Sequence, residues 1–487
     1  MTMKRFLLAL VIVATGCVPK APRTKLASGP PEHWLLYEEG LRAFKEGTPE
    51  GYLRSSNALR RAASLSPSRC EYSLHLAEAL LRLALEQKSN YDEKWDQPAI
   101  EAKAAIGAAE AREDCKALPS LMARVRAMSL GPQFVVGRLT DARNAINNAL
   151  EIDPQDPMNW LVVYELGSRD ARQPLQKAAD LAPDLPIVQY TFGNSQLEQK
   201  TFPEARKTFQ HVIAINPRHF RSYLGQAYTY GEDVTDEIEG LYKKVVEIEP
   251  NFLRGHVVLG DYYASLEEDE KAADSYRESA KRNSKYYSAF LSLGAVLLRN
   301  SKLDEAEPNL RHVIELDLTK PQPPYNAVDF AADSQAHYLL GNLWFERNDI
   351  AKAKSEYELA MKTGPGWPDP VYAMGLALQR EGRIDDALAR FDNVIRLAPS
   401  HADAFKSRGG IRFDRQQYRE AIADFSKAVT LYQMAIAEIE AEARKAESAN
   451  LLRKALSARR RLVRVEQELE TVREAKKKAE ALVGPGN

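Results

Sequence analysis

Small, aromatic and proline residues recur along this chain at a fixed interval. In the segment that begins at Pro186, Gly193, Ala205, Phe209 and Pro217 occupy the eighth, twentieth, twenty-fourth and thirty-second positions. The segment that begins at Pro368 carries the same residue types at the same four positions, namely Gly375, Ala387, Phe391 and Pro399. The pattern has a period of 34 residues, which is longer than one helix and includes a helix stop. It therefore predicts a stack of helix pairs.

Four more segments keep most of this pattern. They begin at Ser334 (Gly341, Ala353, Tyr357, Pro365), Ala402 (Gly409, Ala421, Phe425), Leu253 (Gly260, Ala272, Tyr276) and Tyr287 (Gly294, Ala306, Leu310). Small residues at positions eight and twenty allow two antiparallel helices to cross closely. The aromatic residue fills the space between one unit and the next, and proline prevents the second helix from continuing.

This pattern resembles the tetratricopeptide repeat (TPR) over most of the chain from residue 123 to residue 429. The resemblance implies an all-α fold, in which helix–turn–helix repeats form a right-handed superhelix. The expected parts are degenerate repeats over 32–118, a first TPR block over 119–318 and a second TPR block over 334–433. Residues 319–333 contain Pro321, Pro323 and Pro324, and they either divide the two blocks or form a surface loop without consequence for the stack.

An apolar stripe with steps of mostly three and four residues follows the last repeat. It comprises Leu451, Ala455, Ala458, Leu462, Val465, Leu469, Val472 and Ala479. The spacing predicts a coiled-coil-like helix over residues 434–483, followed by a short tail at 484–487. This helix could cap the solenoid, self-associate or pack against a partner, and residues 447–450 could divide it in two.

The N-terminus has the pattern of an export signal: a basic start, an apolar run too short to span a bilayer, and small residues. Residues 1–16 resemble a bacterial lipoprotein signal peptide, although Ala14 stands where that family prefers leucine. The resemblance implies that Cys17 carries lipid and anchors the chain in the bilayer, with residues 17–31 as a tether. Since Val18 follows the cysteine, it also implies sorting within the cell envelope to the outer membrane, facing the periplasm.

Charge and cysteine content narrow the function classes. The chain has 67 basic and 68 acidic residues, and its net charge of −1 argues against a nucleic-acid binder. With Cys17 used for lipid, Cys70 and Cys115 remain. In an oxidising compartment these two could form a disulfide, or they could be two buried thiols in a helical core.

The sequence shows no pattern of catalytic chemistry. The eight histidines are scattered without metal-ligand spacing, and neither a glycine-rich phosphate loop nor a nucleophile turn is present. Acidic residues cluster at 232–239 and 267–270, where we interpret them as solvated charge in turns rather than a calcium site. We therefore predict a protein that is not an enzyme, with no cofactor and no metal.

The TPR resemblance implies that positions two, five, nine and twelve of each repeat line the concave face. The partner-binding residues expected on this basis are Tyr190, Asn194, Leu197, Tyr338, Asn342, Phe345, Tyr372 and Lys406. These residue types suit an extended peptide or a partner helix, since asparagine can bond a peptide backbone and aromatic rings bury much area. Packing between helices is the alternative, above all for Phe345. Because Lys406 is followed by Gly410 rather than asparagine, recognition of a C-terminal carboxylate is not expected.

These features together predict a protein-binding scaffold of the bacterial envelope. Lipoproteins with such repeats resemble pilotins of type IV pilus secretins, factors of outer-membrane protein assembly and accessory lipoproteins of gliding motility. A trans-envelope complex of the motility, pilus or secretion type is therefore our first hypothesis. The alternatives are a recruiter of peptidoglycan hydrolases or synthases and, from another class, a glycan-binding protein or an enzyme.

Overall fold

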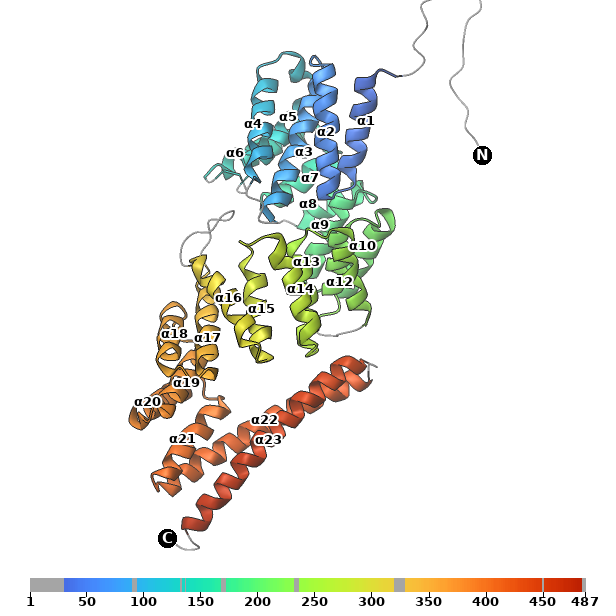
Figure 1. Cartoon of the computed structure of the whole chain (residues 1–487). Helices are drawn as coiled ribbons and strands as arrows, with labels where there is room; N and C mark the ends of the chain where they lie inside the picture. The colour runs from blue at the N-terminus through green and yellow to red at the C-terminus, as the bar shows by residue number, and fades with distance from the viewer. Residues whose placement is uncertain are drawn as a thin grey trace, which may run out of the picture.

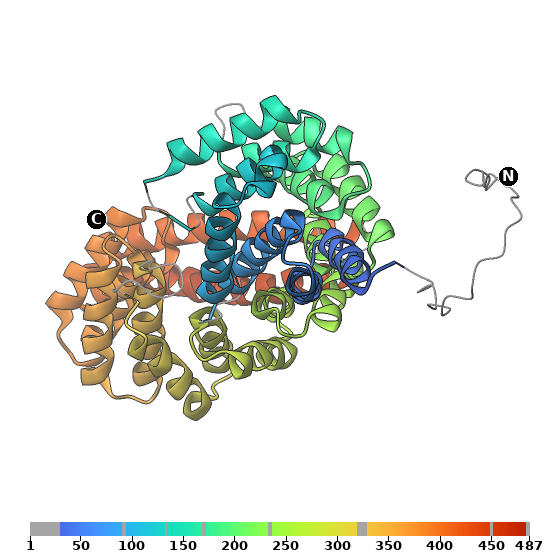
Figure 2. The ribbon, with the colours of Figure 1, turned by 90° about the horizontal axis from the view of Figure 1, so that it is seen from above.

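The computed structural model describes residues 30–89, 94–131, 134–135, 137–167, 172–231, 236–318, 329–448 and 451–483. Every element in these ranges is a helix, so the all-α prediction is confirmed. The helices pack as consecutive antiparallel pairs that wind into a right-handed superhelix (Figures 1 and 2). None of the helices in these ranges combines the length and apolar character that a bilayer span requires. The expected signal peptide, Cys17, most of the tether and of the proline-rich segment, and the tail lie outside the described residues.

The N-terminal block pairs α1 with α2, α3 with α4, α5 with α6 and α7 with α8. Its helices are α1 (Glu32–Lys45), α2 (Pro49–Leu65), α3 (Cys70–Ser89), α4 (Asp96–Glu110), α5 (Pro119–Ser129), α6 (Leu139–Ile152), α7 (Pro157–Glu165) and α8 (Arg172–Leu181), with the short 3-10 helix η1 (Asp114–Ala117) before α5. The pairing shows that helix pairs begin at the first described helix, in the region where the sequence pattern is interrupted.

The clearer repeats follow in two groups. The first group is α9 (Pro186–Glu198), α10 (Phe202–Ile215), α11 (Phe220–Tyr228), α12 (Asp236–Ile248), α13 (Leu253–Ser265), α14 (Asp269–Arg282), α15 (Tyr287–Arg299) and α16 (Leu303–Glu315). The second group is α17 (Phe330–Glu346), α18 (Ile350–Thr363), α19 (Pro368–Arg380), α20 (Ile384–Leu397) and α21 (Ala402–Asp414). The chain ends with α22 (Tyr418–Ser448) and α23 (Leu452–Val483).

The recurring glycine and the recurring large side chain of each repeat contact one another. A Cβ atom added to Gly193, Gly260, Gly294, Gly341, Gly375 or Gly409 would lie 2.4–2.8 Å from Phe209, Tyr276, Leu310, Tyr357, Phe391 or Phe425, respectively. The residue at position twenty-four therefore packs on the glycine of its own repeat. Phe209 also reaches Gly225 of the next repeat, as the sequence interpretation required. This close approach explains why position eight is glycine.

The turn inside each repeat has a repeated backbone conformation. The fifteenth position has a positive φ in Lys200 (59°), Glu267 (57°), Ser301 (56°), Asn348 (61°), Gly382 (81°) and Gln416 (64°). This left-handed region favours glycine, which occurs at one of these six positions. The two flanking helices hold the other five residues in a conformation that side chains disfavour.

The N-terminal block folds back against the repeats that follow it. Asn216 Nδ2 donates to the carbonyl oxygen of Glu46 at 2.8 Å, and Arg218 pairs with Glu50 at 2.8 Å. Phe44 of α1 packs against an apolar cluster of α7–α9. In Figure 2 the blue N-terminal helices accordingly lie inside the curve of the green ones. Part of the concave surface near α9 and α11 is therefore covered by the chain itself.

The C-terminal segment forms two helices, and the break between them falls at residues 447–450, where the sequence left a division open. No proline stands at position thirty-two of the last repeat, where the residue is Gln433, so α22 continues to Ser448. The chain then reverses, and α23 returns antiparallel along α22 (Figure 1). The predicted apolar stripe of α23 is largely buried in this C-terminal hairpin. Its six buried members are Ala455, Ala458, Leu462, Leu469, Val472 and Ala479.

Candidate functional site

A chamber of about 1170 Å³ lies on the concave side of the first TPR block, beneath the C-terminal hairpin. One wall carries Arg254, Val257, Asp261 and Ala264 of α13, which occupy positions two, five, nine and twelve of their repeat. Neighbouring walls come from α11, α12 and the start and end of α15, and α22 and α23 close one side. The positions that the TPR resemblance assigns to the concave face therefore line a hollow here.

Ion pairs hold the C-terminal hairpin against the first TPR block. Arg453, at the start of α23, donates to Glu268 at 2.6 and 2.9 Å and also pairs with Glu239 of α12. Arg464 pairs with Glu267 at 2.5 Å. We call these five residues the latch. Because its ion pairs are partly exposed to solvent, the latch is a polar and reversible contact.

The latch corrects the interpretation of the acidic clusters as solvated charge. That interpretation is wrong for Glu239, Glu267 and Glu268, which receive arginines from α23. A signal for this contact was present in the sequence, since residues 452–465 contain six cationic residues and no acidic one. A half-helix that carries only positive charges predicts a contact with an acidic surface. It does not identify which acidic cluster provides that surface.

The electrostatics of the latch depend on the carboxylate form of Glu239. Burial alone would raise the pKa of Glu239, but hydrogen bonds from Lys243, Arg453 and Tyr263 together lower it from 4.5 to about 2. The pKa values of Glu267 and Glu268 are also lowered, by Arg464 and by Lys271 with Arg453 respectively. A carboxyl group with a lowered pKa stabilises the docked state above its ordinary pKa, and this stabilisation is lost as the pH falls toward the lowered value.

We expect Arg453→Glu to release the C-terminal hairpin from the first TPR block. The substitution places a carboxylate beside Glu239 and Glu268, so attraction becomes repulsion. Small-angle X-ray scattering should show a larger maximum dimension at neutral pH, and the wild type should expand likewise as the pH falls from 4.5 toward 2. Arg473→Glu on the same helix is the control, since Arg473 pairs with its helix neighbour Glu470. Identical scattering of Arg453→Glu and wild type would refute the latch.

The structure separates the predicted partner-binding residues into two places, and those of α9 lie beside the N-terminal block. The Tyr190 ring packs 5.1 Å from the ring of His219 and 6.1 Å from that of Phe209, and it is half-buried. Burial lowers the pKa of His219 to about 3, so this imidazole is neutral under Gly47. Asn194 and Leu197 are half-buried on the same helix.

The second place is α17. The Tyr338 ring lies 4.8 Å from the ring of Trp367, and Asn342 Oδ1 accepts a hydrogen bond of 2.8 Å from the Tyr357 hydroxyl. Phe345 packs under the guanidinium of Arg380, 3.9 Å from the ring centroid. These side chains are half-buried, so each has a packing role besides any role in binding.

Tyr372 and Lys406 continue the row that Tyr338 begins, because all three occupy position five of successive repeats. The Tyr372 hydroxyl and Ser407 Oγ are 3.1 Å apart. Lys406 pairs with Asp403 at 3.2 Å and with Glu468 of α23 at 2.8 Å. The hairpin therefore contacts this row through Glu468, and partner binding by the row stays a prediction.

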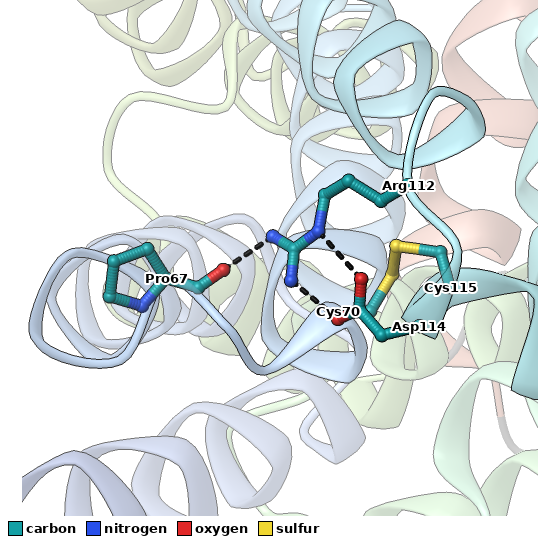
Figure 3. Close-up of a disulfide and its surroundings, with 5 residues drawn as sticks. All are labelled: Pro67, Cys70, Arg112, Asp114 and Cys115. Atoms are coloured by element: carbon teal, nitrogen blue, oxygen red, sulfur yellow. Dashed lines mark hydrogen bonds and ion pairs between the residues drawn. A yellow bond between two sulfur atoms is a disulfide. The ribbon is translucent and has the colours of Figure 1, made fainter.

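A disulfide joins the start of α3 to η1. Cys70 and Cys115 have Cα atoms 5.2 Å apart, and both are buried. Beside the bond, Arg112 pairs with Asp114 and donates to the carbonyl oxygen of Pro67 (Figure 3). Of the two alternatives that the sequence left open, the structure has the disulfide, which ties the second helix pair to the loop before α5.

The described residues contain no group of three histidine, cysteine or acidic side chains that could hold a metal ion. His337 lies between two acidic side chains. Its Nδ1 is 2.7 Å from Glu356, and its Nε2 is 3.9 Å from the buried Asp333. These three residues lie on the α17–α18 pair, away from the chamber lining, and they connect the two helices.

Stacked helix pairs around a concave groove define a repeat solenoid of the TPR type. Residues 257–317 and 372–437 match the family model of the tetratricopeptide repeat. The chain therefore carries TPR repeats over these two segments.

Three known proteins illustrate the similarity. Cellulose synthase operon protein C of Xanthomonas axonopodis pv. citri is 24% identical over 401 residues, which cover 77% of this chain and 26% of that protein. Protein bimA of Emericella nidulans is 26% identical over 194 residues, or 33% of this chain and 23% of that protein. The solved structure of Pseudomonas aeruginosa pilF aligns with 44% of this chain and 92% of its own at 15% identity, with a TM-score of 0.37. The chain spans about a quarter of the length of either curated relative.

Proposed function

We propose that this protein is a non-catalytic, lipid-anchored scaffold of the bacterial cell envelope, which holds partner proteins during assembly of a trans-envelope complex. The observation that carries the proposal is the row of Tyr338, Tyr372 and Lys406 on α17, α19 and α21, at a repeat position that the TPR resemblance assigns to the concave face. Successive repeats present these three side chains in register, which suits a peptide or helix laid across the repeats.

Within this proposal, the complex is of the motility, pilus or secretion type. Recruitment of peptidoglycan hydrolases or synthases is the alternative. Crosslinking in cells that express the tagged full-length protein, followed by mass spectrometry of the captured partners, separates the two. Capture of secretin, porin or motor components supports the proposal, whereas capture of murein enzymes alone would replace it with the alternative.

Export and anchoring are part of the proposal. The N-terminal signal pattern and Cys17 favour attachment to the outer membrane on its periplasmic side. The Cys70–Cys115 disulfide agrees with this location, because disulfides persist in oxidising compartments such as the periplasm. Self-association is a further element, for which the exposed Leu456 and Val463 of α23 are the candidate contacts, since the stripe itself is largely buried.

We expect Cys17→Ala to move the protein from the membrane fraction to the soluble periplasm. Without the thiol no acyl chain can be attached, and no described helix could span the bilayer in its place. Cell fractionation followed by immunoblotting measures the distribution. Cys115→Ala serves as the matched control and should stay with the membrane. Persistence of Cys17→Ala in the membrane fraction after a high-salt wash contradicts the anchor.

We expect Tyr338→Ala combined with Asn342→Ala to weaken capture of the partner by about tenfold or more, as for a binding hot spot. Both side chains are half-buried, so circular dichroism should show nearly unchanged helical content. The control is Ser355→Ala combined with Leu359→Ala, two exposed residues with the same spacing on α18. If the first pair causes a large loss of helix, the two residues serve the core and not the partner.

A further inference from the structure

The face of α23 that docks on the first TPR block is polar. Arg453, Ser457 and Arg464 project from one side of the helix, because spacings of four and seven residues correspond to nearly whole turns. Arg453 and Arg464 belong to the latch, and Ser457 Oγ donates to the carbonyl oxygen of Ser265 at 3.1 Å. The apolar stripe of the same stretch lies on the opposite side of the helix, and no apolar cluster of the described residues joins α23 to α12–α14. Docking of α23 on this block therefore rests on polar contacts.

The surface that receives this face is a row of three carboxylates, Glu239 of α12 and Glu267 and Glu268 in the turn between α13 and α14. We call these three residues the acidic edge. Two of them also pair with a cation of the first TPR block, since Glu239 lies 2.8 Å from Lys243 and Glu268 lies 2.7 Å from Lys271. Departure of α23 therefore leaves these two carboxylates paired, so the arginines of α23 can be exchanged for others.

The chamber lies beside the acidic edge, and the docked α23 does not fill it. Lys454 and Arg461 of α23 line the chamber, which keeps a volume of about 1170 Å³. Its lining also includes Tyr242, Val258 and Ala264, which are partly exposed. A helix with apolar side chains in place of Lys454 and Arg461 buries this part of the lining, and burial of apolar surface is the main favourable contribution to protein association. Such a helix binds more tightly than α23 itself can.

We propose that the acidic edge is a docking site for a cationic amphipathic helix of a partner protein, and that α23 occupies this site in the free chain. Two arginines of the partner helix take the places of Arg453 and Arg464, and its apolar side chains enter the chamber. The C-terminal hairpin is then an internal cover, which the partner displaces. The inference does not rest on the proposed scaffold function, because the row of Tyr338, Tyr372 and Lys406 is a separate surface.

The spacing of the two arginine positions favours a helix over a disordered basic segment. Arg453 and Arg464 are eleven residues apart, which is about 16 Å along a helix. The acidic edge pairs with both of them at once. A helix holds two arginines at this separation before it binds, whereas a disordered segment loses backbone freedom at every residue that becomes fixed. We therefore expect the acidic edge to select cationic helices.

Fluorescence anisotropy with a labelled peptide tests the proposal. The peptide has the sequence of residues 452–465, and a side-chain cross-link between positions 456 and 463 keeps it helical, since isolated helices of this length are marginal. Both positions are exposed on α23. The protein is the full chain with Arg453→Glu and Arg464→Glu, which repels its own α23 and keeps the acidic edge. We expect this opened protein to bind the peptide at least about tenfold more tightly than the wild type, whose edge is occupied.

The control protein carries Arg473→Glu combined with Lys477→Glu. These substitutions make the same change of charge on α23 and leave the latch intact, so this protein should bind the peptide as weakly as the wild type does. Circular dichroism and thermal melts accompany the titrations. If the opened protein melts early, Arg453→Gln combined with Arg464→Gln replaces it, because these substitutions remove the attraction without adding repulsion.

Three variants of the peptide locate the contact on the opened protein. Arg453→Ala combined with Arg464→Ala should weaken binding by about tenfold. Arg459→Ala combined with Arg461→Ala removes the same charge, but these two arginines pair with α22 in the hairpin, so binding should weaken by less than about threefold. Lys454→Leu combined with Arg461→Leu should strengthen binding by about tenfold, because the leucines bury apolar lining of the chamber.

Four results overturn the proposal. The first is equal affinity of the opened and control proteins for the peptide, or no binding by either. The second is equal affinity of the peptide with and without its cross-link. The third is an equal loss for the two pairs of alanine substitutions, or no gain from the leucines. The fourth is a wild-type dimer that Arg453→Glu dissociates, since that result assigns the acidic edge to α23 of a second copy of this chain.

Discussion

Gly375→Leu is expected to destabilise the second TPR block by about 3 kcal/mol, at the upper end of the usual cost of overpacking a core. A Cβ atom at this position would lie 2.6 Å from Cε1 of Phe391, and further carbons of leucine would enter space already filled by that ring. Phe391 is fully buried and cannot turn aside without opening the contact between α19 and α20. Urea denaturation followed by circular dichroism measures the loss.

Gly410→Leu is the matched control for this substitution. Gly410 lies inside helix α21, yet an added Cβ atom would have no neighbour within 4 Å. Since glycine is a poor helix former, leucine there should leave stability unchanged or raise it by about 0.5–1 kcal/mol. Equal unfolding curves for Gly375→Leu and wild type would mean that this glycine does not face the ring of its repeat in solution.

Loss of the Cys70–Cys115 disulfide is expected to destabilise the N-terminal block by about 4 kcal/mol. The two cysteines are separated by 45 residues, and the loop-closure entropy of a cross-link over that length gives this magnitude. Cys70→Ala combined with Cys115→Ala removes the bond and keeps small apolar side chains at two buried positions. Denaturant unfolding with a fluorescent label in α3 measures the effect.

Reduction provides an independent check on the same bond. A reducing agent should shift the unfolding midpoint of the wild type toward that of the double variant, and it should leave the variant unchanged. An equal response of both proteins to the reducing agent, or no response of the wild type, would show that the two thiols are not bonded in the folded protein.

The repeats were predictable because their signal is local and repeated. Gly260 and Tyr276 belong to the same helix pair, so the contact between them follows from sixteen residues of sequence and recurs in five other units. The concave positions came instead from the resemblance to the TPR, and Arg254 and Asp261, which occupy two of these positions, line the chamber. The α3–α4 pair could not be placed in register, since it lacks that glycine pattern, whereas in α1–α2 the pattern is interrupted but Gly40 still packs on Leu59.

The chamber itself could not be derived from the sequence. Its second side depends on the reversal between α22 and α23 and on the contact of Arg453 with Glu239, 214 residues earlier in the chain. A contact between residues so far apart in the sequence leaves no periodic pattern that could predict it. For the same reason, the predicted residues Tyr190 and Tyr338 gave no indication that the N-terminal block lies beside one of them.

The latch also fixes the order in which parts of this protein can fold during synthesis. Domains and repeats generally fold as they emerge, N-terminal parts first, and contacts between distant segments are the slowest to form. The acidic residues of the latch therefore lack their arginine partners until α23 has been synthesised. These residues are Glu239, Glu267 and Glu268. A chain shortened before α23 would still build its repeats but leave the chamber without its cationic side. A complete chamber therefore indicates that α23 has been synthesised and docked.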